Sequence, residues 1–63
     1  MIVTIKDLRW LGLCSGQCRK QFVDRGLSWD DFLKNGIHED ILRENFHDNA
    51  IVIESLERLH GRG

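Results

Sequence analysis

Apolar residues recur at helical spacing through most of the chain, and glycines interrupt them at intervals. The first such segment follows Thr4, places Leu8 and Leu11 on one face, and reaches Gly12. Thr4 and Asp7 stand three residues apart, as in a capping box, in which both side chains pair with backbone amides at a helix start. This pattern predicts a short helix from residue 5 that a left-handed glycine ends.

Four further helices are predicted from the same combination of capping residue, helical spacing and closing glycine. Their expected positions are roughly 16–25 after Ser15, a short helix between Ser28 and Gly36, about 38–45, and a last helix that follows Asp48 or Asn49 and ends at Gly61. The chain is therefore expected to form one small all-α domain over residues 1–63, a compact bundle of about five short helices. Residues 1–3 and 61–63 are expected to be frayed.

The inward faces of these helices supply the expected core. Residues 51–53 are β-branched and could form a strand, but the spacing that continues to residue 59 favours a helix. The predicted core residues are Leu8, Cys18, Phe22, Trp29, Phe32, Ile41, Leu42, Val52 and Leu56.

Two segments of the chain, residues 4–13 and 28–37, are similar to each other. Both contain a capping hydroxyl, an acid, an apolar residue, a glycine and a closing aliphatic residue. The second segment begins 24 residues after the first, and Phe46 likewise follows Phe22 by 24 residues. The pattern is consistent with two helix–turn–helix units followed by a C-terminal capping helix. The alternative is that short, well-capped helices draw on few residue types and so look alike.

Three motifs are arranged in order along the chain: T-x-x-D-L-R at 4–9, L-C-S at 13–15, and F-x-x-x-G-L-x-W-x-x-F-L-x-x-G-I at 22–37. Together they resemble a group of short helical proteins encoded in phage and prophage genomes. The resemblance covers most of residues 4–59 and departs at 45–50, where the group has T-G-D-x-x-A. It implies a phage or prophage origin and a helical fold, but no chemistry, because the group has no established activity.

Composition narrows the class of protein. Hydrophobic residues make up 41% of the chain and charged residues 30%, which suits a folded domain rather than a disordered tail. No apolar run is long enough for a membrane span, and the N-terminal residues do not follow the order of a secretory signal. With two cysteines and no such signal, the expected compartment is the cytoplasm, that of the host cell if a phage encodes the protein.

A zinc-stabilised module is one alternative, because Cys14 and Cys18 could join two of His38, His47 and His60. These histidines are far apart in sequence, whereas structural sites usually hold a closely spaced pair. Cys18 also falls on a core stripe, where a free cysteine behaves as a small hydrophobic residue. No nucleophile, base and oxyanion motif accompanies the cysteines either. We therefore expect no metal, no cofactor, no catalytic residue and no enzymatic activity.

A small DNA-binding regulator is the second alternative, since residues 22–32 loosely fit the spacing of a helix-turn-helix. The recognition helix would then be 28–35, which presents Asp30 and Asp31 to the DNA. Carboxylates are repelled by phosphates, so nucleic-acid binding is disfavoured.

Charge is unevenly distributed along the chain. Residues 1–27 hold five basic and two acidic side chains, net +3, and residues 28–50 hold two basic and six acidic ones, net −4. Trp10 lies off the Leu8–Leu11 stripe and is either exposed or packed across the turn. We therefore expect a non-enzymatic, phage-type accessory protein that binds a host or virion protein or a second copy of itself. The expected binding residues are Arg9, Trp10, Arg19 and Lys20.

Overall fold

The computed structural model describes residues 1–62, which form five helices and a small two-stranded sheet. In chain order the elements are β1 (Ile2–Val3), α1 (Ile5–Trp10), α2 (Ser15–Asp24), α3 (Trp29–Asn35), β2 (Ile37–His38), α4 (Glu39–Asn45) and α5 (Ala50–Gly61). The molecule measures 29 × 24 × 19 Å. The prediction of a small, mostly helical bundle with five short helices is confirmed.

The helix starts follow from local capping chemistry. The Ser28 hydroxyl accepts a hydrogen bond from the backbone amide of Asp31 at 3.1 Å, and the Asn49 side chain accepts from the first amides of α5. At α1 the Asp7 carboxylate accepts from the backbone amide of Thr4 at 2.9 Å. The second helix starts earlier than expected: Cys14 is its N-cap and Ser15 is its first residue.

The N-terminal residues are ordered, contrary to the expectation that residues 1–3 are frayed. Ile2 pairs with His38 and Val3 with Ile37 in an antiparallel ladder between β1 and β2. Val3 is only 1% exposed, and burial of its side chain anchors the strand. At the other end, Gly61 is the last residue of α5 rather than frayed, and Gly63 lies outside the described residues.

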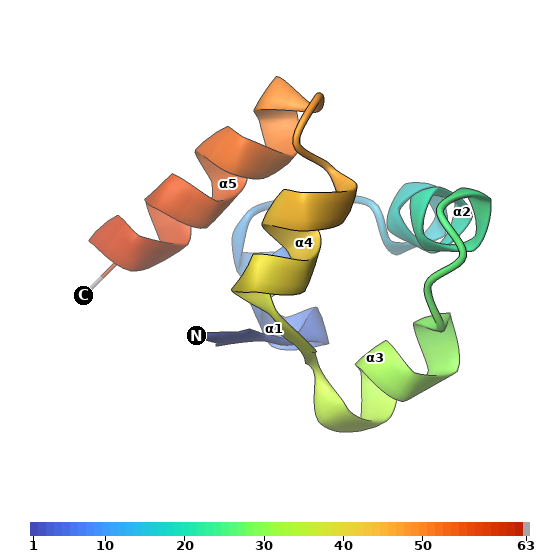
Figure 1. The fold of residues 1–63 in the computed structure, drawn as a ribbon. Helices are drawn as coiled ribbons and strands as arrows, with labels where there is room; N and C mark the ends of the chain where they lie inside the picture. Colours follow the sequence, from blue (N-terminus) through green and yellow to red (C-terminus); the bar gives the residue numbers. More distant parts are fainter. Residues whose placement is uncertain (63) are drawn as a thin grey trace.

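The helices surround a common centre, with α4 between α2 and α5 in the view of Figure 1. Helix α4 contacts both α5 and β2, and α2 contacts α3. The sheet brings the N-terminus back beside the start of α4, since the backbone amide of Glu39 donates to the carbonyl of Met1 at 3.0 Å. The N-terminus and the C-terminal end of α5 therefore lie on the same side of the molecule (Figure 1).

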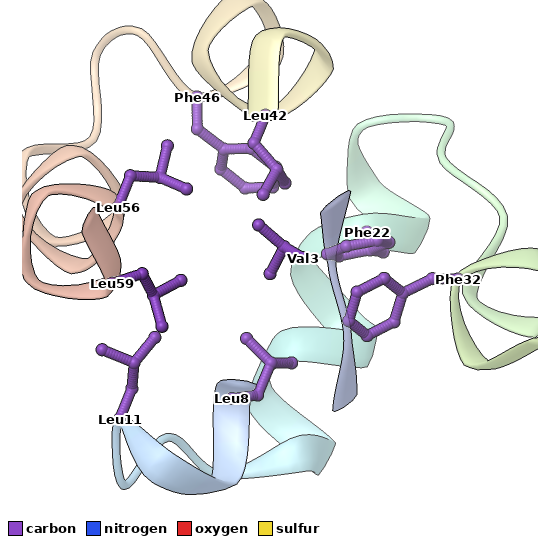
Figure 2. Close-up of a cluster of buried hydrophobic side chains, with 9 residues drawn as sticks. All are labelled: Val3, Leu8, Leu11, Phe22, Phe32, Leu42, Phe46, Leu56 and Leu59. Atoms are coloured by element: carbon purple, nitrogen blue, oxygen red, sulfur yellow. The ribbon is translucent and has the colours of Figure 1, made fainter. Parts of the chain in front are cut away.

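The core contains side chains from β1 and all five helices, which point toward one another in Figure 2. Of the predicted core residues, five are buried: Leu8, Phe22, Phe32, Leu42 and Leu56. Three are half-buried and pack against that core: Cys18, Trp29 and Val52. Four further residues complete it: Val3, Leu11, Phe46 and Leu59.

The prediction that Ile41 is a core residue is wrong, because its side chain is 43% exposed. Adjacent residues on a helix diverge by about 100°, so the seven-residue α4 cannot turn both Ile41 and Leu42 inward. Leu42 takes the inward position, and Phe46, one turn later, is 2% exposed.

The internal similarity seen in the sequence reappears in the element boundaries. Helix α3 begins as far along the chain from the start of α1 as α4 does from the start of α2. Gly12 and Gly36, which occupy equivalent positions in the two similar segments, have positive φ angles of 76° and 74°. The two halves differ in detail, because α2 has 10 residues and α4 has 7.

Candidate interaction surface

Trp10 is an exposed aromatic residue at the end of a short helix. Leu8 and Leu11 of the same segment enter the core, so the Trp10 ring is directed outward, and 48% of the residue is exposed. The chain reverses immediately afterwards, because Gly12 has a positive φ and the amide of Leu13 bonds to the carbonyl of Leu8. Trp10 is therefore the last residue of α1, directly before a hydrogen-bonded turn.

Two arginines flank the Trp10 ring: Arg58 in the last turn of α5, and Arg62, the C-cap that directly follows α5. The guanidinium carbon of Arg62 lies 5.1 Å from the ring centroid, and that of Arg58 lies 5.6 Å away. Arg58 and Arg62 are four residues apart, which places both on the side of α5 that faces α1. Such cation–π contacts orient the ring and surround it with positive charge. We call Arg9, Trp10, Arg58 and Arg62 the Trp10 face.

The structure places the four predicted binding residues on two helices. Arg9 and Trp10 lie on α1 and are exposed, and Arg19 and Lys20 are exposed on α2. The cations that contact the Trp10 ring come instead from α5 (Arg58) and from its C-cap (Arg62). Sequence reasoning missed Arg58 and Arg62. The signal in the sequence that could have indicated them is that they stand four residues apart, near the C-terminal end of the last predicted helix.

Asp7 supports the Trp10 face through an ion pair with Arg62. It is a buried acidic residue, and its carboxylate pairs with Arg62 at 2.8 Å and accepts from the Thr4 amide. Burial by itself would raise the pKa of Asp7, but the hydrogen bonds from Thr4 and Arg62 outweigh it and hold the pKa below its usual value. Asp7 thereby fixes Arg62 beside Trp10 and joins the start of α1 to the end of α5.

A second charged cluster surrounds Glu39 at the start of α4. Its carboxylate lies 2.8 Å from the Met1 amino group, 2.7 Å from His60 Nε2 and 3.5 Å from Arg43 Nε. The hydrogen bond from the Met1 amino group, followed by that from His60, lowers the pKa of Glu39 to about 2. One carboxylate thus connects the N-terminus, α4 and α5.

Acid should weaken the fold through Glu39. The unfolded chain takes up a proton at Glu39 near the ordinary pKa of 4.5, whereas the folded chain does so near 2. Between these values the unfolded state binds more protons, so stability is lost as pH falls from about 4.5 to 2. In urea denaturation across this range, the advantage of the parent protein over Glu39→Gln should shrink toward zero. A difference that stays constant with pH would contradict the assignment.

The two cysteines occupy different environments. Cys14 is exposed at the start of α2, where backbone hydrogen bonds from Gln17 and then Gly16 lower the pKa of its thiol. Cys18 is half-buried, and burial raises the pKa of its thiol. Within residues 1–62, no group of three or more His, Cys, Asp and Glu side chains is placed to hold a metal ion.

Three other acidic and imidazole groups lie at helix starts. Asp30 and Asp31 lie in the first turn of α3, where carboxylates complement the helix dipole. His38 caps α4 through Nδ1, which accepts from the amide of Asp40 at 3.1 Å. These residues stabilise helix starts, whereas Arg9, Trp10 and Arg58 of the Trp10 face are exposed to solvent.

No protein-family model, no curated protein and no solved structure matches the chain. Among the described helices, none is both long and apolar enough to cross a membrane. The geometry of the Trp10 face is accordingly the basis on which a function is proposed.

Proposed function

We propose that this chain is a non-enzymatic accessory protein that binds an acidic surface of a partner protein through the Trp10 face. The observation that carries the proposal is a half-exposed tryptophan fixed between two arginines. Tryptophan and arginine are the residue types most enriched among those that dominate binding energy at protein interfaces. The resemblance to short phage-encoded proteins favours a virion or host protein as the partner, in the cytoplasm of the host cell.

The two parts of the face have different roles in this proposal. The Trp10 ring supplies apolar area at small entropic cost, because its position is already fixed by the turn and by Arg62. Arg9 and Arg58 supply positive charge, which steers an acidic partner and sets its orientation. A second copy offers one such partner surface, since residues 28–50 carry net charge −4. In that case the protein self-associates.

Substitutions in the face test the proposal. Trp10→Ala and Arg58→Glu should each remain folded and weaken binding at least about tenfold, as expected for central interface residues. For binding to a host or virion protein, Lys34→Glu is the matched control for charge, because Lys34 is exposed on α3 outside the Trp10 face, and this variant should be captured like the parent in the pull-down. The measurements are sedimentation velocity at several concentrations and quantitative pull-down with each variant as bait. Added salt should weaken binding of the parent.

Two results would contradict the proposal. One is retention of parental binding by folded Trp10→Ala and Arg58→Glu, which would place the interface elsewhere. The other is a gel shift of DNA that weakens with salt and disappears in Arg58→Glu, because the face would then be a nucleic-acid site. Unfolding of Trp10→Ala would show that the ring is needed for the core, and Arg58→Glu would then decide the outcome.

A further inference from the structure

The centre of the bundle contains an apolar cavity that lies apart from the Trp10 face. Its volume is about 210 Å³, and side chains from β1 and all five helices line it. Its deep wall includes Leu8, Leu11, Leu56 and Leu59, whose side chains point toward the shared space in Figure 2. The cavity is partly open to solvent, so it is a recess into the core and not a sealed void.

The helix arrangement explains why the space is not closed. Helix α5 packs on α4, and α2 packs on α3, so α2 and α5 are held apart with α4 between them (Figure 1). The rim of the cavity lies between these two helices and includes Gln17 and Gln21 of α2 and Ile51 of α5, all of which are exposed. A small molecule can therefore reach the interior from solvent along this edge.

The lining specifies the chemistry of an occupant. Within the described part of the chain, no Asp, Glu, Lys, Arg or His side chain lines the cavity. A charged ligand would lose its hydration without gaining a counter-charge, so the occupant must be neutral. Ser55 already donates to the carbonyl of Ile51 and Asn49 already caps α5, so the rim amides of Gln17 and Gln21 are the groups placed to bond a polar end.

The volume of the cavity limits the size of the molecule that it can hold. An apolar cavity of about 150 Å³ accommodates one benzene molecule, so this larger one should accept roughly eight non-hydrogen atoms. We propose that the cavity is a binding site for a small neutral aromatic molecule with a single hydroxyl or comparable polar group, its ring among the leucines and its polar end at the glutamines. The site is independent of the proposed protein-binding function, because Trp10, Arg58 and Arg62 do not line it.

Benzyl alcohol and benzoate are the probes, because they share a ring and differ in charge. Leucine methyl resonances, followed by NMR, report on the cavity wall directly. Benzyl alcohol should cause saturable shifts at Leu56 and Leu59, and benzoate should bind at least about tenfold more weakly because its carboxylate would be partly dehydrated at the rim without gaining a counter-charge. Trp10→Ala should leave benzyl alcohol binding unchanged, which separates this site from the Trp10 face.

Two pairs of matched variants test the location. Val52 lines the cavity, whereas Val23 is 61% exposed and does not line it. Val52→Phe should therefore fill the space and weaken benzyl alcohol binding at least about tenfold, while Val23→Phe should bind like the parent. If Val52→Phe does not fold, the pair Cys18→Leu and Cys14→Leu makes the same comparison, because Cys18 lines the cavity and Cys14 does not.

The proposal is overturned if benzyl alcohol causes no saturable shift at Leu56 or Leu59. It is equally overturned if benzoate binds as well as benzyl alcohol. Parental affinity in a folded Val52→Phe or Cys18→Leu variant would also place binding outside the cavity.

Discussion

Replacing Phe32 with alanine is expected to cost about 3–5 kcal/mol of the free energy of unfolding, the usual range for a buried aromatic residue. Phe32 is 2% exposed, and its ring centroid lies 4.9 Å from that of Phe22 and 5.2 Å from that of Trp29. Truncation would remove two of the three ring contacts in this group and leave only that between Phe22 and Trp29. Because small domains have little stability in reserve, the loss should largely unfold the protein at room temperature.

Leu33→Ala is the matched control, since Leu33 follows Phe32 on α3 and is 47% exposed. It should change stability by less than about 1 kcal/mol, as surface substitutions usually do. Circular dichroism during chemical denaturation measures both variants. Equal midpoints for Phe32→Ala and the parent would mean that the aromatic group does not hold the core together.

Gly36→Ala is expected to have the second large effect and to lower the free energy of unfolding by at least about 3 kcal/mol. Two costs add at this position, the strain of the backbone conformation and the steric overlap of the new Cβ. Gly36 has φ 74° and ψ −172°, a conformation that residues with a Cβ rarely adopt. A Cβ at this position would also lie 2.7 Å from the carbonyl oxygen of Val3 and 2.7 Å from Ile2 Cγ2. Since one of these atoms belongs to the backbone of β1, the strand would have to move.

Gly26→Ala separates the two causes. Gly26 has a similar φ of 73°, but a Cβ there would meet nothing within 4 Å. Gly26→Ala should therefore lower the free energy of unfolding by only about 1–2 kcal/mol, the cost of a left-handed backbone conformation for a residue with a Cβ. Denaturation midpoints measure the difference, and amide hydrogen exchange at Glu39, whose N–H bonds to Met1, reports on β1. Equal costs for the two variants would show that the contact with β1 does not matter.

The parts of the fold that depend on neighbours in sequence could be predicted. Ser28 and Asn49 cap the helices that follow them, and Gly12 and Gly36 have the positive φ angles expected where helices end. These features are governed by interactions within about four residues. The assignment of helix to residues 51–53 was correct for a similar reason, since the spacing beyond them outweighed their β-branched side chains.

The parts that depend on distant segments could not be predicted. A strand of two residues is too short to show the alternation of apolar and polar positions that predicts a strand. Residues 1–3 were therefore expected to be frayed, although β1 pairs with β2 from the middle of the chain. Ile41 and Leu42 are both apolar, and only the positions of α5 and β2 decide which of them faces inward. In the same way, the cations beside Trp10 come from residues 58 and 62, and the cavity results from how α2 and α5 are held apart.

The pairing of β1 with β2 also constrains the order in which the protein can be assembled. During synthesis, Ile2 and Val3 leave the ribosome well before their strand partners, Ile37 and His38. Helices α1 to α3 lie between them and can form on the microsecond scale from local contacts alone. The ladder must instead wait for a long loop to close, and non-local pairing of this kind slows folding. Val3 thus remains an uncovered apolar residue on the nascent chain until α4 emerges, so a residue that is made before all five helices is among the last to be buried.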